Sequence, residues 1–188
     1  MRIIAGRHKG HKLFGPKDKS IRPTSDRVKE NLYNILSAID SDFFAAKIVL
    51  DLFAGSGALG LEALSRGAAR CVFVDKASEA LEILKNNIAK LGVEKQSSVL
   101  QANINNLSLL AQQGYVFDIV FADPPYGYDF GRVVLQQLSA HKLLSEDAFF
   151  ILEEASNVAL PEAVAEFSLL QYRNYGAASL AIYKRQLI

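Results

Sequence analysis

The sequence predicts an α/β fold: a mostly parallel, doubly wound sheet that ends in an antiparallel hairpin. Two observations predict it. From residue 47 onward, short apolar runs alternate with stretches of helical length, which is the pattern of parallel βαβ units. Near the C-terminus, two strand-like runs are separated only by a short glycine-containing turn, and a connection that short joins antiparallel strands.

The periodicity places the individual elements. Strands are expected at residues 48–50, 71–74, 98–100, 117–122 and 148–152, with the terminal hairpin at 167–175 and 178–184. Helices are expected at residues 59–64, 78–91, 107–113 and 130–139. In the second of these, apolar residues recur at helical spacing, and Gly92 ends the helix. An earlier amphipathic helix, which contains Val28 to Ile39, is predicted to begin after Thr24 or Ser25, either of which can cap it.

A basic segment precedes the α/β pattern. Residues 2–14 are predicted to form a hairpin of two short strands, with Gly10 near the turn. Residues 1–29 hold nine of the 21 Lys and Arg residues and two acids, a net charge of +7, whereas the remainder of the chain carries −6. Segregated charge of this kind indicates contact with a polyanion, although a solvated basic tail has the same composition. The expected organisation is a basic N-terminal arm, residues 1–23, followed by one domain, residues 24–188.

Composition excludes several classes of protein. No apolar run approaches the ~20 residues that span a bilayer, and no apolar stretch follows the N-terminal charges as in a secretory signal. The single cysteine, Cys71, excludes an internal disulfide, fits a cytoplasmic location and is predicted to be a small core residue. His8, His11 and His141 lack the spacing of metal ligands, so no metal site is expected.

A glycine-rich loop is the first functional motif. Gly55, Gly57 and Gly60 match G-x-G-x-x-G between a predicted strand and a predicted helix, where the absent side chains allow a ligand to approach the backbone. Asp75 lies 20 positions after Gly55, at the end of the next strand, where a carboxylate accepts hydrogen bonds from ribose hydroxyls. This pair predicts a nucleotide-like cofactor.

The residues around the loop favour S-adenosylmethionine over a dinucleotide. The carboxylate of Asp51, just before the glycines, would repel a pyrophosphate but suits the ammonium of a methionine group. Phe53, in the same loop, is a further candidate for cofactor binding. Asn103, after the third strand, stands where many class I methyltransferases have an aspartate, and its side-chain oxygen can still accept a hydrogen bond from the adenine amine.

The tetrapeptide Asp123-Pro124-Pro125-Tyr126 follows the fourth strand, at the end of the sheet where such folds bind ligands. An exocyclic base amine is a poor nucleophile, and strong acceptors on its hydrogens make it attackable. Asp123 is a charged acceptor, and the carbonyl of Pro124 is a second one, directed by two prolines of fixed φ. Tyr126 offers a face on which the base can stack. The motif predicts methyl transfer to an exocyclic amine without a metal.

Together these motifs resemble methyltransferases of exocyclic base amines, and the N-terminal residues resemble one family of them. Arg2-Ile-Ile-Ala-Gly6, Arg22-Pro-Thr24 and Asp26-Arg27-Val28-Lys-Glu30 are similar to the RsmD family of bacterial 16S rRNA guanine-N2 methyltransferases. The resemblance implies that the substrate is a guanine of 16S rRNA, either naked or in the assembling small ribosomal subunit. The protein is expected to be a monomer. It places Arg22 and Thr24 beside the methionine end of the cofactor. It also implies RNA contacts from the basic arm, whose candidates are Arg2, Arg7, Lys9 and Lys12.

Three other functions stay open at this point. The same chemistry on the N6 amine of adenine, in DNA or RNA, uses the same tetrapeptide. A nicotinamide-dependent oxidoreductase would share the glycine loop, but Asp51 and the Asp-Pro-Pro-Tyr motif argue against it. A non-catalytic RNA-binding module would not require Asp123.

Overall fold

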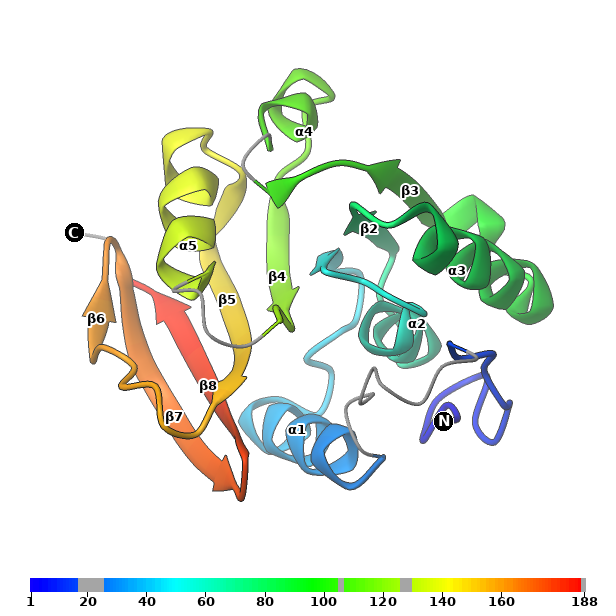
Figure 1. Ribbon diagram of the computed structural model, residues 1–188, viewed down its shortest axis with the longest axis horizontal. Helices are drawn as coiled ribbons and strands as arrows, with labels where there is room; N and C mark the ends of the chain where they lie inside the picture. The colour runs from blue at the N-terminus through cyan, green and yellow to red at the C-terminus, as the bar shows by residue number, and fades with distance from the viewer. Residues whose placement is uncertain (17–25, 105–106, 126–129, 187–188) are drawn as a thin grey trace. The chain divides into compact units, whose positions relative to one another are not determined.

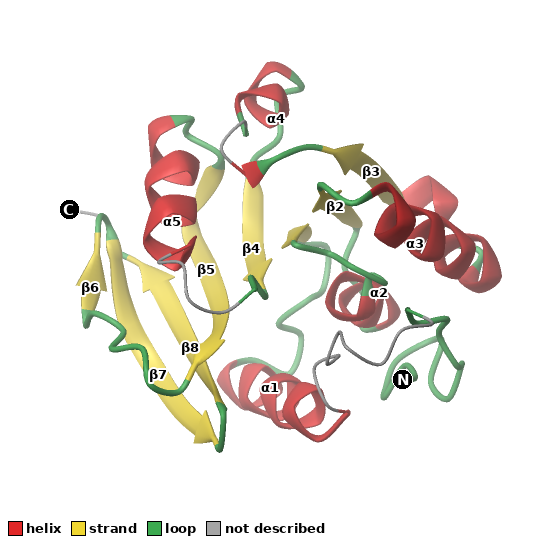
Figure 2. Cartoon of the chain, viewed as in Figure 1, coloured by secondary structure: helices red, strands yellow, loops and turns green. Residues whose placement is uncertain are grey.

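A computed structural model describes residues 1–16, 26–104, 107–125 and 130–186. The chain divides into two compact units, Met1–Gln101 and Ala102–Ile188. Figure 1 shows the first unit from blue to green and the second from green to red, and Figure 2 separates helices from strands.

The first unit is built on three parallel strands. They are β1 (Ile48–Leu52), β2 (Arg70–Asp75) and β3 (Ser97–Gln101), with β2 in the middle. Leu52 pairs with Val74, and Asp75 pairs with Gln101, so the loops after β1 and β2 leave from the same edge. Cys71 is fully buried in β2, and burial followed by the charge of Asp51 raises the pKa of its thiol. The prediction of a core cysteine is confirmed.

One helix precedes these strands, and the others connect them. In chain order, the helical elements are α1 (Asp26–Ile39), α2 (Ala58–Ser65), α3 (Ser78–Leu91) and a 3-10 turn at Glu94–Gln96. The predicted helix at residues 78–91 is confirmed, and it ends at Gly92 in the left-handed conformation. Its apolar residues Leu81, Leu84, Ile88 and Leu91 are all buried, as the periodicity predicts.

The N-terminal hairpin, residues 1–14, belongs to the first unit. Arg2 and Lys12 form an antiparallel bridge. Flanking hydrogen bonds join the amide of Ile3 to the carbonyl of His11 (3.0 Å) and the amide of Leu13 to the carbonyl of Met1 (3.1 Å). Ile3 and Leu13 are buried, so one side of the hairpin packs inward. The predicted hairpin is confirmed, but its pairing is one isolated bridge, and residues 1–16 contain neither of the two predicted short strands.

The second unit combines one parallel strand pair with an antiparallel extension. Its strands are β4 (Phe117–Ala122), β5 (Leu144–Ala155), β6 (Ala163–Val164), β7 (Phe167–Tyr175) and β8 (Ala178–Arg185), and its helices are α4 (Ser108–Gln112) and α5 (Phe130–Ala140). β4 and β5 are parallel, whereas β8, β7 and β6 follow antiparallel. The α/β class and its terminal hairpin are thus confirmed.

Strand β5 is longer than its apolar run predicts. The run covers residues 148–152, but the strand begins at Leu144 and ends at Ala155. Its last three residues pair with Leu180, Ser179 and Ala178 of β8, so hydrogen bonds to a neighbouring strand extend it through polar sequence. The two-residue strand β6 and the 3-10 turn have no periodicity and were not predicted.

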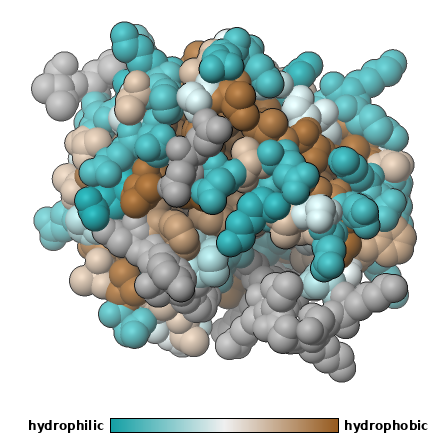
Figure 3. All heavy atoms as spheres, turned by 45° about the horizontal axis from the view of Figure 1, so that its top comes forward, coloured by the Kyte–Doolittle hydropathy of each residue, from teal (hydrophilic) through white to brown (hydrophobic). Residues whose placement is uncertain are grey.

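Hydrophilic and hydrophobic residues are interspersed on the face that Figure 3 shows. Such a mixed surface is normal for a folded protein. Across residues 1–16, 26–104, 107–125 and 130–186, no helix has both the length and the apolar character to cross a membrane.

Candidate functional site

The glycine loop joins β1 to α2 through a tight turn. The amide of Gly57 donates to the carbonyl of Ala54 (2.7 Å), and the amide of Ala54 donates to the carbonyl of Val74 in β2 (3.1 Å). Phe53, Gly55 and Gly57 all have positive φ, at 56°, 55° and 81°. Gly55 and Gly57 adopt this conformation without strain, whereas Phe53 carries a side chain that disfavours it.

The glycines of the motif differ in what surrounds them. A Cβ on Gly57 would lie 2.3 Å from a methyl of Leu84, and one on Gly60 would lie 2.5 Å from the sulfur of Cys71. Among residues 1–16, 26–104, 107–125 and 130–186, a Cβ on Gly55 would meet only the carbonyl oxygen of Phe53, at 3.9 Å. Gly57 and Gly60 thus permit packing within the protein, whereas the space beside Gly55 is open to a ligand.

Asp51 is buried at the end of β1, beneath the loop. One of its carboxylate oxygens accepts a hydrogen bond from the amide of Gly60 (2.8 Å), an amide in the first turn of α2. A carboxylate at this end of a helix is favourable because the first amides lack helical partners. Asp51 therefore holds the loop-to-helix turn together, while a contact with the cofactor's ammonium stays a prediction.

Asp75 lies beside Gly55, as the spacing predicted. Its Oδ2 accepts the amide of Gly55 (2.9 Å), and its Oδ1 accepts the amide of Ala77 (2.9 Å). The side chain is half-buried. Each carboxylate oxygen has two acceptor positions, so the side chain is oriented by the backbone and retains capacity for a ligand's hydroxyl groups.

The site candidates of the second unit are Asn103, Asp123, Pro124 and Pro125. Asn103 is exposed. Asp123 directly follows β4, the next residue, Pro124, is buried, and Pro125 is exposed. Tyr126, Arg22 and Thr24 lie outside the described residues. Within the first unit, the fold brings together Asp51, the glycine loop and Asp75, and the roles of the other residues stay predictions.

The four predicted RNA contacts of the hairpin, Arg2, Arg7, Lys9 and Lys12, are all exposed. Lys29, which contributes to the basic count of the segment, is different. Only 1% of its side chain is exposed, and its ammonium donates to the carbonyl of Arg2 and lies 3.8 Å from the carboxylate of Glu62. Lys29 is an internal partner of the hairpin and not part of the surface that a polyanion would meet.

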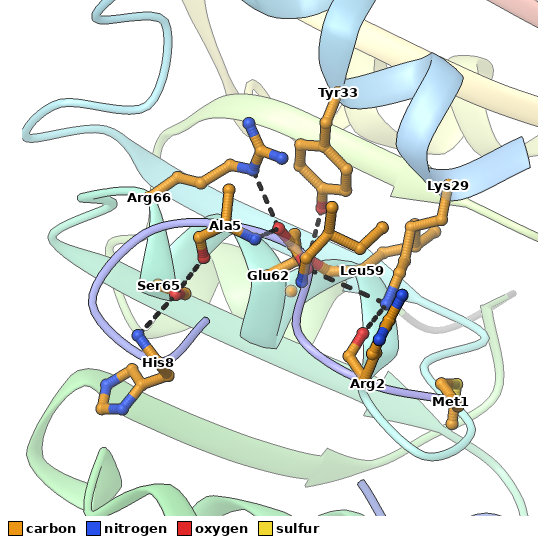
Figure 4. Close-up of polar contacts among 12 residues, drawn as sticks. Met1, Arg2, Ala5, His8, Lys29, Tyr33, Leu59, Glu62, Ser65 and Arg66 are labelled. Carbon is orange, nitrogen blue, oxygen red and sulfur yellow. Dashed lines mark hydrogen bonds and ion pairs between the residues drawn. The ribbon is translucent and has the colours of Figure 1, made fainter. Parts of the chain in front are cut away.

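Glu62 is the residue that sequence reasoning missed. It lies in α2 with 0% exposure, and its carboxylate accepts the amides of Ile4 (2.7 Å) and Ala5 (2.9 Å) and the Nε of Arg66 (2.9 Å). Figure 4 shows this carboxylate between the hairpin, α1 and α2. A buried charge needs such partners, and a glutamate inside the apolar run 59–64 was the available signal.

Ser65 gives the hairpin a second attachment to α2. Its hydroxyl donates to the carbonyl of Ala5 (2.6 Å) and accepts the amide of His8 (2.9 Å), and its carbonyl accepts the amide of Arg7 (2.8 Å). Gly6 approaches so closely that a Cβ there would lie 1.9 Å from the carbonyl oxygen of Ser65. The hairpin is therefore fixed to the helix that follows the glycine loop.

Tyr33 joins α1 to the same helix. Its buried hydroxyl donates to the carbonyl of Leu59 (2.6 Å). Burial, then the charges of Glu62 and Asp51, raise the pKa of this phenol well above its usual value, so it remains a neutral donor. The guanidinium of Arg66 lies over its ring, 4.5 Å from the centroid.

His8 and His11 lie next to each other in the hairpin. Their rings contact each other edge to face, and burial followed by the charges of His11 and Arg7 lowers the pKa of His8. No group of three or more His, Cys, Asp or Glu residues that could hold a metal occurs in the part of the chain that the structure describes.

The chain is similar to known proteins over its whole length. The family model described as conserved hypothetical protein 95 matches residues 1–184. "Ribosomal RNA small subunit methyltransferase D" of Escherichia coli strain K12 is 36% identical over 186 residues, which cover 99% of this chain and 90% of that protein. The protein of the same name from Haemophilus influenzae is 33% identical over 188 residues, with 98% and 93% covered.

Solved structures agree with this similarity. The structure titled "Putative methyltransferase yhhF from Escherichia coli" is 35% identical and has a TM-score of 0.84, with 99% of this chain and 98% of that chain covered. At this similarity the two chains share one fold.

Proposed function

The chain belongs to the family described as conserved hypothetical protein 95, the RsmD family, and on this premise we propose that it methylates the exocyclic N2 amine of a guanine in 16S rRNA. S-adenosylmethionine is its cofactor. The relatives named small subunit rRNA methyltransferases, at 33–36% identity over nearly the whole chain, support the proposed RNA substrate.

The observation that carries the proposal is the pairing of Gly55 with Asp75. The backbone of Gly55 borders open space, and its amide orients the carboxylate of Asp75 beside that space. Such a pairing fits a ligand that brings ribose hydroxyls against a glycine turn. Asp51, fixed to the start of α2, adds negative charge next to the loop, which suits the ammonium of a methionine group better than a pyrophosphate.

The bound cofactor supplies an electrophilic methyl group. Asp123 would accept a hydrogen bond from the guanine amine, and the carbonyl of Pro124 would accept the second hydrogen. With both hydrogens held, the nitrogen lone pair would bond to the methyl carbon as the carbon–sulfur bond breaks, and S-adenosylhomocysteine would leave as a neutral thioether. The carboxylate would stabilise the positive charge that develops on the nitrogen until the nitrogen loses one of its protons. Tyr126 would provide a stacking face for the base.

Asp123→Asn tests this mechanism because it keeps the side chain's size and an acceptor oxygen but removes the charge. We expect single-turnover methyl transfer to 16S rRNA to fall at least ~10-fold, as charge-assisted hydrogen bonds are about twice as strong as neutral ones. Affinity for S-adenosylmethionine should stay within a few-fold of the parent, because the contact strengthens in the transition state. Asp147→Asn is the matched control, since Asp147 is 82% exposed.

Nucleoside analysis tests the target atom. 16S rRNA and small subunits are incubated with the protein and labelled S-adenosylmethionine, then digested to nucleosides. Label in N2-methylguanosine is the expected result. Label in N6-methyladenosine would replace the guanine target by the adenine alternative, and a parent protein that binds the cofactor but labels no RNA would contradict the RNA substrate.

A further inference from the structure

Phe14 is a large aromatic residue left exposed at the end of the N-terminal hairpin. Its side chain is 52% exposed, whereas the preceding Leu13 is buried. Single exposed hydrophobic residues are common and carry no conclusion by themselves. Phe14 differs from them in how its backbone is held and in the charges around its ring.

Asn87 of α3 holds the backbone of Phe14 from both sides. Its Oδ1 accepts the Phe14 amide (2.7 Å), and its Nδ2 donates to the Phe14 carbonyl (3.0 Å). The same Nδ2 donates to the carbonyl of Ser56, between the first two glycines of the loop (2.9 Å). Asn87 is fully buried and the three bonds are partly buried, so water competes with them less than at an exposed surface. Phe14 is thus held in place next to the glycine loop, and ordering its backbone adds no cost when a ligand binds.

The surroundings of the ring are basic. The ammonium of Lys90, from the last turn of α3, lies 4.5 Å from the ring centroid of Phe14. Lys12, two residues earlier in the hairpin, is exposed, and its backbone pairs with that of the exposed Arg2 in an antiparallel β-bridge. An exposed ring among cations is the combination by which proteins bind single-stranded nucleic acids, because the cations neutralise phosphates while the ring stacks on a base.

We propose that Phe14 stacks on an unpaired base of the RNA substrate and that Lys12 and Lys90 bind the neighbouring phosphates. The proposal rests on the proposed function for the nature of the substrate and adds the requirement of an unpaired nucleotide at the hairpin. Every base has a π face, so this contact contributes affinity and little sequence preference. Asn87 acts as the positioning residue.

The chain contains no tryptophan, which makes a direct test available. Phe14→Trp introduces a sole tryptophan at the proposed contact, and its emission is followed during titration with a single-stranded RNA oligomer. We expect saturable quenching with the single strand and little change with a fully paired duplex. Tyr172→Trp is the control, since Tyr172 is an exposed aromatic residue of β7. Equal responses from both variants, or none from Phe14→Trp at saturating RNA, would overturn the proposal.

Affinity measurements give an independent test. Phe14→Ala should weaken single-strand binding roughly 10-fold, equivalent to ~1.4 kcal/mol, while its salt dependence stays unchanged because no charge is lost. Phe14→Tyr should retain affinity, and Tyr172→Ala should match the parent. If Phe14→Ala binds single-stranded RNA with unchanged affinity while the parent methylates rRNA, the stacking contact is overturned and the proposed function is retained. Lost affinity for S-adenosylmethionine would instead assign Phe14 to the cofactor, and a parent that neither binds nor methylates RNA removes both proposals.

Discussion

Replacing Glu62 by Gln should destabilise the protein more than any surface change, although Glu62 lies outside the proposed chemistry. The carboxylate has 0% exposure and accepts three hydrogen bonds, from Ile4, Ala5 and Arg66. Glutamine keeps the shape and one acceptor oxygen but presents a donor in place of the second. The buried ammonium of Lys29, 3.8 Å away, also loses its opposite charge.

The magnitude follows from these contacts. Hydrogen bonds to charged groups contribute about 1.5–3 kcal/mol each, against 0.5–1.5 for neutral ones, and removing one member of a buried ion pair costs about 3–5 kcal/mol. Because these effects overlap, we expect a loss of ~3 kcal/mol in the free energy of unfolding. That is a large part of the 5–15 kcal/mol typical of a folded domain.

Urea unfolding followed by circular dichroism measures this loss, and hydrogen exchange localises it. The amides of Ile4 and Ala5 should exchange much faster in Glu62→Gln, while the exposed control Glu82→Gln should match the parent. Adding Lys29→Met to Glu62→Gln should restore part of the stability, because the uncompensated charge is then gone. A Glu62→Gln protein within ~0.5 kcal/mol of the parent, with both amides still protected, would refute this account of the buried cluster.

Three further predictions concern the cofactor loop and the second unit. Asp75→Asn should weaken S-adenosylmethionine binding roughly 10- to 150-fold by calorimetry, since losing charged hydrogen bonds costs about 1.5–3 kcal/mol; an unchanged dissociation constant in the folded variant would remove Asp75 from the site. Gly55→Ala and Gly57→Ala share the strain of positive φ, about 1–2 kcal/mol. Only Gly57→Ala also displaces Leu84, so Gly57→Ala should have the lower melting temperature of the two variants. Gly55→Ala should lose more affinity for the cofactor. A lower melting temperature for Gly55→Ala, or a larger loss of cofactor affinity for Gly57→Ala, would contradict the assignment of open space at Gly55. Burial raises the pKa of Tyr183 to about 12, and its hydroxyl donates to the carbonyl of Pro161 (3.0 Å). Between pH ~10 and ~12 the folded state therefore keeps this proton, whereas the unfolded state loses it. The contribution of Tyr183 to the free energy of unfolding is fully present below pH ~10 and declines by up to ~1.4 kcal/mol per pH unit between about 10 and 12. Tyr183→Phe should flatten that decline in urea titrations, and a slope equal to the parent's would contradict it.

Much of the fold is predictable from local sequence. Helix α3 has the bounds that its apolar spacing predicts, and β4 coincides with its apolar run at residues 117–122. The pairing of Gly55 with Asp75 follows from a 20-residue spacing, because a βαβ unit places those positions at one edge of a parallel sheet. The helix and the strand depend on the periodicity of single segments and the pairing depends on the spacing within one βαβ unit, and a sequence displays both directly.

The buried polar residues were decided by tertiary structure. Lys29 belongs to the basic segment by composition, yet it is internal because Glu62 of α2 lies beside it. Asn87 stands among the apolar positions of α3 and is fully buried, where it bonds both Phe14 and Ser56. Its partners lie 73 and 31 residues away in the chain. A polar residue on an apolar face indicates that a hydrogen-bond partner exists, because burying a polar group without a partner destabilises the fold. Which residue is that partner depends on the packed fold, since only packing brings two distant segments within hydrogen-bonding distance.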